Sequence, residues 1–150
     1  MTLAFVLAAL APAALGQTTV KDPWVRGTVA QQKASGFFAQ ITSTAGGRLI
    51  AASSPVAGVV EVHEMSMAGD TMQMRAIAAL DLPAGKSVEL KPGGYHVMLM
   101  DLKQQLRAGD VVSITLVIEG AAGKREVLEV KAPVKALGAG AGAAPSAPKH

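Results

Sequence analysis

The 150-residue chain contains no cysteine. This absence excludes disulfides, thiolate metal ligands, a thiol nucleophile and a lipid-modified N-terminal cysteine. It also excludes a blue-copper electron-transfer centre, which needs a Cys thiolate. Any transition metal that these residues bind must therefore be held by other ligands.

Aromatic residues are scarce as well, at 3% of the chain, although half of the residues are hydrophobic. We therefore expect a core built from Val, Leu, Ile and Ala, and a length that suits one domain. The net charge is +3, but basic residues are spread from Lys21 to Lys149 and are interleaved with acidic ones. Without a basic stripe, a nucleic-acid partner is not expected.

The first sixteen residues, MTLAFVLAALAPAALG, carry no charged side chain. Their apolar stretch is short for a helix that spans a bilayer, and Ala14-Leu15-Gly16 suits signal-peptidase cleavage before Gln17. The positive charge that usually precedes such a stretch is missing, and a buried N-terminal helix is the alternative. We predict a signal peptide over residues 1–16, export of the protein and no stable membrane insertion.

Short runs rich in Val, Ile and Leu recur between Gly, Pro and Asp from Thr18 to Pro133, whereas helical periodicity is hard to find. This pattern is typical of strands joined by turns. Strands are predicted at Val20–Arg26, Gly36–Thr42, Arg48–Ser53, Val59–Met67, Met72–Ala76, Ser87–Leu90, His96–Met100, Val111–Ile118 and Glu126–Val130. Eight or nine short strands at this spacing indicate an all-β fold, either a β-sandwich or a Greek-key barrel.

Low complexity begins after Leu137, where the sequence reads GAGAGAAPSAPKH. This segment has nothing to bury, so we predict a folded domain over residues 17–136 and a disordered tail over residues 137–150. The terminal His150 could assist metal capture, but an ordinary chain end is the simpler interpretation.

The methionines are unevenly placed. Apart from the initiator, all six lie within one 38-residue window, His63–Met100, together with two of the three histidines. The window holds Met65, Met67, Met72, Met74, Met98 and Met100, with His63 and His96. Core methionines are normally scattered as gap fillers, so this clustering with histidine needs another explanation.

Strand parity places several of these side chains on common faces, because side chains alternate along a strand. If Gly69-Asp70 forms a two-residue type II′ turn, Met67 faces Met72 and Met65 faces Met74. His63 then lies diagonal to Met74, a spacing of about 7–8 Å that two long side chains can bridge around one ion.

A soft metal ion explains this arrangement best. Thioether sulfur is soft and neutral and selects Cu(I) over hard cations, and imidazole suits copper in either oxidation state. Zn²⁺ would be expected to use Cys, His or carboxylate ligands. Taken singly, each His fits a satisfied polar residue and each Met fits core packing, but their joint placement favours a soft-metal site.

The segment also resembles the PCu(A)C family of periplasmic copper chaperones, whose signature is His-x10-Met-x21-His-x-Met. Here His63, Met74, His96 and Met98 meet every spacing of that signature. The flanking segments DPWVRGT, SSPVAGVVEVHEM and LPAGKSVELKPGGYHVMLMDLKQQL are similar to the family too. The likeness runs from about Val20 to Val134.

This resemblance implies a cupredoxin-like β-sandwich that binds Cu(I) through those four residues in the periplasm. It further implies delivery of copper toward the binuclear copper centre of cytochrome c oxidase, with subunit II or a Sco-type thiol protein as the acceptor. We expect a monomer. Some relatives carry a His- and Met-rich C-terminal extension, whereas this chain has only the Gly-Ala-Pro tail, so a further site there is not expected.

Other residues of the window have open interpretations. We treat Met65, Met67, Met72 and Met100 as candidates for contacts around the site or for a docking surface, with hydrophobic packing as the alternative. Tyr95 precedes a predicted ligand and either shields the site or packs at a strand end. Glu64 is expected on the opposite face from His63.

The sequence is compatible with several competing functions. No nucleophile–base pair or carboxylate dyad accompanies the histidines, so we do not expect an enzyme. A copper storage or tolerance protein would share the site without delivering the ion. Two rival functions of a different kind are a β-sandwich binding module without metal and a redox enzyme that uses Cu(II).

Overall fold

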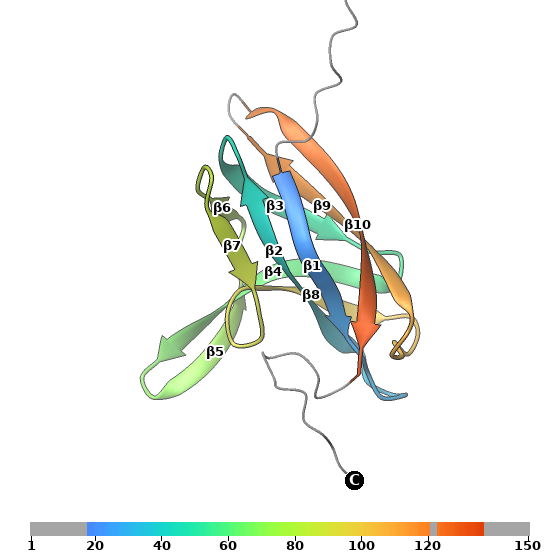
Figure 1. The fold of residues 1–150 in the computed structure, drawn as a ribbon. Coiled ribbons are helices and arrows are strands. Elements are labelled where there is room, and N and C mark those ends of the chain that lie inside the picture. Colours follow the sequence, from blue (N-terminus) through green and yellow to red (C-terminus); the bar gives the residue numbers. More distant parts are fainter. Residues whose placement is uncertain (1–17, 121–122, 137–150) are drawn as a thin grey trace, which may run out of the picture.

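The computed structural model describes residues 18–120 and 123–136 (Figure 1). The predicted signal peptide (1–16) and the predicted tail (137–150), with its His150, lie outside the described residues, and so does Gln17. Among the described residues, no helix is long and apolar enough to cross a membrane.

Strands make up the regular structure of the part of the chain that is described, which confirms the all-β prediction. Their bounds are β1 Thr18–Arg26, β2 Ala34–Ser43, β3 Gly47–Ser53, β4 Ala57–Ala68, β5 Thr71–Ala76, β6 Leu80–Leu82, β7 Ser87–Leu90, β8 His96–Leu102, β9 Val111–Glu119 and β10 Arg125–Lys135. Each predicted strand is present, several with longer ends.

One strand, β6, was not predicted. It has only three residues and pairs with β3, with Leu80 opposite Leu49 and Leu82 opposite Gly47. Three residues are too few for alternation to be recognised, and Leu82 directly precedes the Pro83 turn. Pairing with a neighbouring strand, not local pattern, makes this segment a strand.

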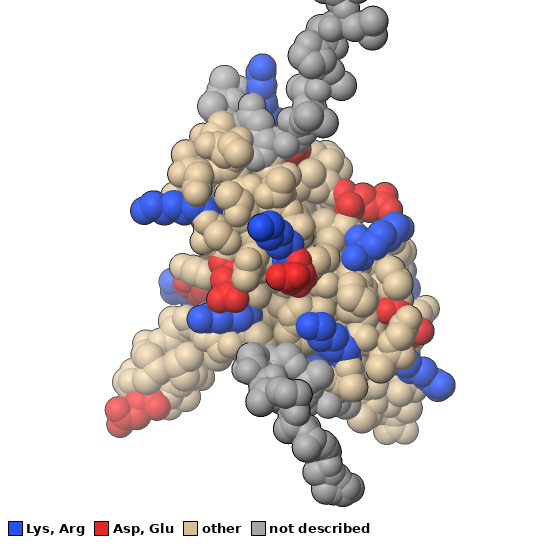
Figure 2. Space-filling model, in the orientation of Figure 1, with Lys and Arg blue, Asp and Glu red and all other residues tan. Residues whose placement is uncertain are grey.

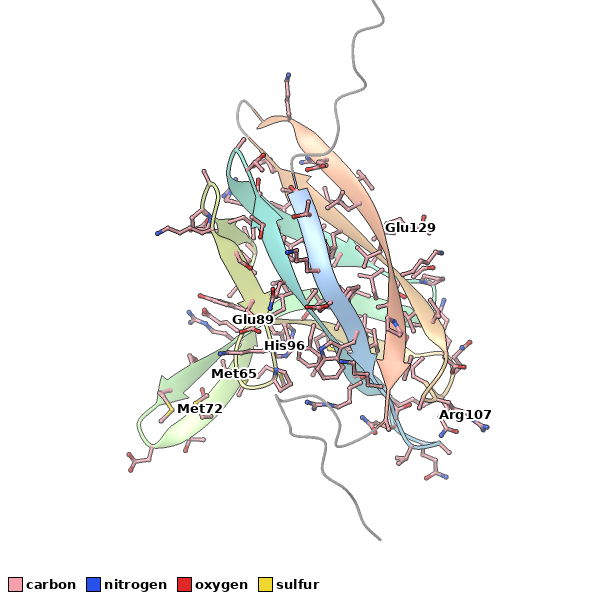
Figure 3. The ribbon with its side chains drawn as sticks, in the orientation of Figure 1. Met65, Met72, Glu89, His96, Arg107 and Glu129 are labelled. Carbon is pink, nitrogen blue, oxygen red and sulfur yellow. The ribbon has the colours of Figure 1, made fainter. Side chains whose placement is uncertain are left out.

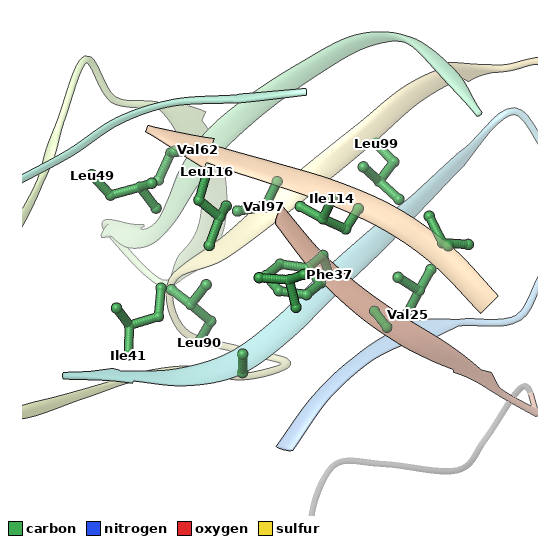
Figure 4. Packing of buried hydrophobic residues seen from close by; sticks show 14 of the residues in the cluster. Val25, Phe37, Ile41, Leu49, Val62, Leu90, Val97, Leu99, Ile114 and Leu116 are labelled. Atoms are coloured by element: carbon green, nitrogen blue, oxygen red, sulfur yellow. The ribbon is translucent and has the colours of Figure 1, made fainter. Parts of the chain in front are cut away.

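The strands follow the order β5-β4-β8-β2-β1-β10-β9-β3-β6, with β7 paired to β2. The β1–β10 pair is parallel, and the other pairs are antiparallel. Buried side chains of β2, β4 and β8 meet those of β3 and β9 between the two halves of this path (Figure 4). The result is a β-sandwich, with the β4–β5 hairpin projecting from one end (Figure 1).

The core combines aliphatic residues with one central aromatic ring. Strand β9 illustrates the alternation, because Val112, Ile114, Leu116 and Ile118 are buried and their neighbours are not. Phe37 is fully buried among these side chains (Figure 4). The expectation of a core that relies on Val, Leu, Ile and Ala is confirmed, with Phe37 as the one aromatic residue of the buried cluster.

A bulge in β1 moves Trp24 away from the core. Lys21 pairs with Gln40, but Trp24 pairs with Phe38, so the register shifts by one residue between them. Asp22 adopts a positive φ of 51° within this bulge, a conformation that Asp tolerates better than most residues. Trp24 consequently stacks on Phe38 on the outer face of the sheet, with ring centroids 4.6 Å apart.

Charged side chains of both signs are interleaved on the face shown in Figure 2. On that face the projecting hairpin is uncharged over most of its surface and carries acidic atoms at its end. This neutral surface belongs to the methionine-bearing strands β4 and β5.

Candidate metal centre

The β4–β5 hairpin has the register that the sequence predicted. Gly69 adopts a positive φ of 65° at the first position of the two-residue turn, as a type II′ turn requires. Met67 faces Met72, and Met65 faces Met74. His63 faces Ala76 and therefore lies diagonal to Met74.

Strand β8 then brings the second histidine to the first. In the antiparallel β4–β8 pair, His63 lies directly opposite His96, and their ring centroids are 5.7 Å apart. The adjoining pair, Val62 opposite Val97, points into the core. Burial of the valines on one face therefore places both imidazoles on the other face.

His96 presents a lone pair to the sulfur of Met74. Its Nδ1 lies 3.1 Å from the carbonyl oxygen of Gly94, and because a carbonyl only accepts hydrogen bonds, Nδ1 carries the proton of the neutral ring. The other nitrogen, Nε2, lies 3.0 Å from Met74 Sδ. Neither atom then carries a hydrogen, so two electron-pair donors converge on one point.

His63 has the opposite tautomer. Its Nε2 lies 2.9 Å from a carboxylate oxygen of Glu61, so this nitrogen donates the hydrogen bond. Its Nδ1 is buried and has no hydrogen-bond partner. Buried polar atoms are normally paired, and metal-ligating imidazoles commonly donate their other N–H to a carboxylate. The orphaned Nδ1 is therefore the nitrogen available to a metal.

A cleft of about 340 Å³ opens beside the histidines. Three of the four predicted ligands line it, namely Met74, His96 and Met98, and so does Met65. His63 does not line the cleft. It lies opposite His96 on the neighbouring strand, with 9% of its surface exposed. In Figure 3, His96 and Met65 lie where the hairpin meets the sandwich.

The wall of the cleft opposite the hairpin is formed by β1 and β2. Gly36 faces Met98 across the β2–β8 pair, and a Cβ at Gly36 would lie 2.8 Å from the ring of Phe38. Glycine thus lets this ring lie over the strand, 6.2 Å from the His96 ring. The Arg26 guanidinium lies over the Phe38 ring, 5.4 Å from its centroid, and Arg26 also lines the cleft.

The described residues contain no group of three or more His, Asp or Glu side chains placed to hold a metal ion. Thioether sulfurs do lie at this cleft, on Met65, Met74 and Met98, and thioether ligands favour a soft ion over Zn²⁺ or Mg²⁺.

One contributor, Glu61, was missed in the sequence. Glu61 and Met65 each lie two residues from His63, so strand parity alone places them on its face. Met65 was treated as a candidate for contacts around the site or for docking, with hydrophobic packing as the alternative, and it lines the cleft. Glu64 points the other way, as predicted, and pairs with Arg75 at 2.7 Å.

The other methionines between His63 and Met100, and Tyr95, differ in how exposed their side chains are. Met67 and Met72 are largely exposed, so hydrophobic packing does not explain them. Met100 is half-buried opposite Ala34 and Val59. Tyr95 is exposed and does not line the cleft, so the structure gives it no shielding role.

Comparison with solved structures defines the class of domain. The "Copper-bound PCuAC domain from PmoF2" has a TM-score of 0.65 at 26% identity, covering 83% of this chain and 97% of that one. The apo-DR1885 protein from Deinococcus radiodurans has a TM-score of 0.59 at 28% identity, covering 93% and 97%. The structure of CuI-DR1885 has a TM-score of 0.55 at 28% identity, covering 85% and 81%. The predicted cupredoxin-like fold of PCu(A)C domains is confirmed.

Sequence comparison gives the family. The family model described as "Putative lipoprotein LpqE-like" matches residues 18–134, and the chain belongs to this LpqE-like family. The "Putative lipoprotein Lxx21020" of Leifsonia xyli subsp. xyli is 35% identical over 101 residues, covering 65% of this chain. That alignment spans 59% of the relative's own length.

Protonation of His96 is disfavoured in the folded protein. Burial lowers the pKa of His96 from its ordinary value of 6.5, the hydrogen bond to Gly94 opposes this, and His63 and Arg26 lower it further. At pH values below about 6.5 the unfolded chain, in which His96 keeps its ordinary pKa, therefore binds more protons than the folded chain. The free energy of unfolding should consequently fall as the pH falls below about 6.5. At neutral pH His96 is uncharged, the form that ligates metals.

NMR titration of the His96 ring in the metal-free protein tests whether the pKa of His96 is lowered. We expect a titration midpoint below 6.5. The variant His96→Asn should lose part of the acid destabilisation measured by urea unfolding. A titration midpoint of His96 at or above 6.5 would contradict the lowered pKa.

Proposed function

We propose that this protein binds one Cu(I) ion through His63, Met74, His96 and Met98 and passes it to an acceptor protein. One observation carries the proposal. Met74 Sδ lies 3.0 Å from the unprotonated Nε2 of His96, and the ring of His63, whose buried Nδ1 has no partner, lies 5.7 Å from the His96 ring. Such convergence of donor atoms suits a ligand set that awaits a metal ion.

The chemistry of the donors supports Cu(I) in particular. Two neutral imidazoles and two thioethers form an uncharged set with soft sulfur, which matches a soft monovalent ion. The solved structures of similar domains include a copper-bound PCuAC domain and CuI-DR1885, which supports this assignment.

Ligand exchange is the mechanism that the geometry favours. The histidines are buried, whereas Met74, which lines the cleft, is 45% exposed. An acceptor's ligand can therefore displace the Met74 sulfur first, while the imidazoles still hold the ion. Transfer of an ion in this way makes or breaks no bond in a substrate, so the protein is not an enzyme under this proposal.

We further propose that this exchange takes place in the periplasm after export, which the lipoprotein names of the family and of its relative support. The motif resemblance points to the binuclear copper centre of cytochrome c oxidase, with subunit II or a Sco-type protein as acceptor. Copper storage or tolerance is the second candidate, because it would use the same four ligands.

Anaerobic titration with Cu(I) against a chromophoric chelator tests the site. The wild-type chain should take up one tight equivalent, and His63→Ala/Met98→Ala should weaken it at least about 100-fold, because two of four ligands are lost. Met100→Leu is the matched control, since Met100 lies on the same face of β8 as Met98 but outside the cleft. Equal affinity of the double variant and the wild type would refute the ligand assignment.

Glu61 and Glu64 offer a matched pair of variants. Glu61→Ala should weaken Cu(I) binding about 10–100-fold, because Glu61 holds the His63 tautomer. Glu64→Ala should leave the affinity unchanged, because Glu64 pairs with Arg75 on the opposite face. The same titration measures both, and equal effects of the two variants would mean that the tautomer does not matter.

Delivery and storage predict different rates of Cu(I) transfer to an acceptor protein. A chaperone should pass Cu(I) to the metal-free copper domain of oxidase subunit II faster than it releases the ion to a chelator of equal affinity, because ligand exchange avoids the free ion. Stopped-flow measurement of both transfers distinguishes the two functions. Equal rates would favour storage.

A further inference from the structure

The β4–β5 hairpin is a projecting element that contributes little to the core. Strand β5 lies at the end of the strand order and pairs only with β4, and all six of its residues are exposed. Figure 1 shows the hairpin extending away from the sandwich. Its composition therefore needs a reason other than core packing.

The two faces of this hairpin differ completely. Met65, Met67, Met72 and Met74 share one face, in two directly facing pairs. The other face carries polar side chains at the positions in between. These are Glu64, Ser66, Gln73 and Arg75, again in facing pairs, with an ion pair between Glu64 and Arg75.

Stability does not explain the methionine face. Met67 is 61% exposed and Met72 is 49% exposed, so about half or more of the stabilisation that full burial would bring, about 25 cal/mol per Å² of apolar surface, is absent. Val, Ile or Thr would form an exposed strand more readily than Met.

The ability of thioethers to bind soft ions does explain the methionine face. Side chains that face each other across an antiparallel pair have Cβ atoms about 4.5–5.5 Å apart, and Met has three rotatable bonds with which to turn its sulfur inward. The sulfurs of Met67 and Met72 can therefore close on one soft ion. Met65 lies two residues further along β4, about 7 Å away, within reach as a third donor.

The methionine face is also continuous with the proposed metal centre. Beyond Met67 and Met72 comes the Met65–Met74 pair, and Met74 Sδ is the atom that lies 3.0 Å from His96 Nε2. In Figure 3, Met72 lies toward the end of the hairpin, whereas Met65 and His96 lie at its base. An ion held at the end of the hairpin is thus one step of ligand exchange from Met74.

We propose that Met67 and Met72 form a second, weaker Cu(I) site at the end of the hairpin, and that this site loads the His63–His96 centre. The binding at Met67 and Met72 stands independently of the proposed function. Only the direction of loading rests on that function.

The test is anaerobic Cu(I) titration of the full chain, monitored by the methyl NMR signals of the methionines. The wild type should bind a second equivalent at least tenfold more weakly than the first, with shifts of the Met67 and Met72 methyl signals. Met67→Leu/Met72→Leu should lose this second equivalent and keep the first unchanged. Ser66→Ala/Gln73→Ala, on the polar face of the same hairpin, should keep both.

A further variant separates this proposal from the function proposed above. In His63→Ala/His96→Ala the tight equivalent should disappear while the weaker one persists with the same methyl shifts. A wild type that binds only the tight equivalent, or a Met67→Leu/Met72→Leu variant that still binds two, would overturn the second site. A wild type that binds only the weaker equivalent would refute the proposed function and leave this site standing.

Discussion

The pairing of β4 with β8 is the constraint on which the candidate metal centre depends. Val62 and Val97 face each other in the core, and the adjacent residues His63 and His96 face each other on the outside. A slip of one residue would exchange the two faces, exposing valine and burying imidazole among apolar side chains. The free energy of core burial therefore maintains the distance between the histidines without any metal.

Much of this arrangement could be predicted from the sequence because it is local. Gly69-Asp70 and strand parity were sufficient to predict the facing methionine pairs, and the signature spacing predicted the four candidate ligands. The β4–β8 pairing joins segments more than thirty residues apart, and no local pattern identifies a distant partner strand. The three-residue strand β6 was missed for the same reason, since only its pairing with β3 defines it.

The finer chemistry of the site depends on three-dimensional contacts. The tautomers of the two histidines are determined by Gly94 and Glu61, and strand parity could have suggested Glu61 but not its hydrogen bond. The bulge at Asp22 brings Trp24 against Phe38, which lines the cleft, a consequence of register that composition does not reveal. Under the proposed function, the buried imidazoles would hold the ion on one side of the site, and the partly exposed sulfur of Met74 would leave the other side open.

X-ray absorption at the copper edge of the Cu(I)-loaded protein tests the central claim most directly, because it identifies the atoms bound to the ion. The account predicts imidazole nitrogen and thioether sulfur together in the coordination sphere, with the sulfur contribution lost in Met74→Leu/Met98→Leu loaded with one equivalent. A coordination sphere of nitrogen and oxygen alone, or sulfur scattering unchanged in that variant, would contradict it.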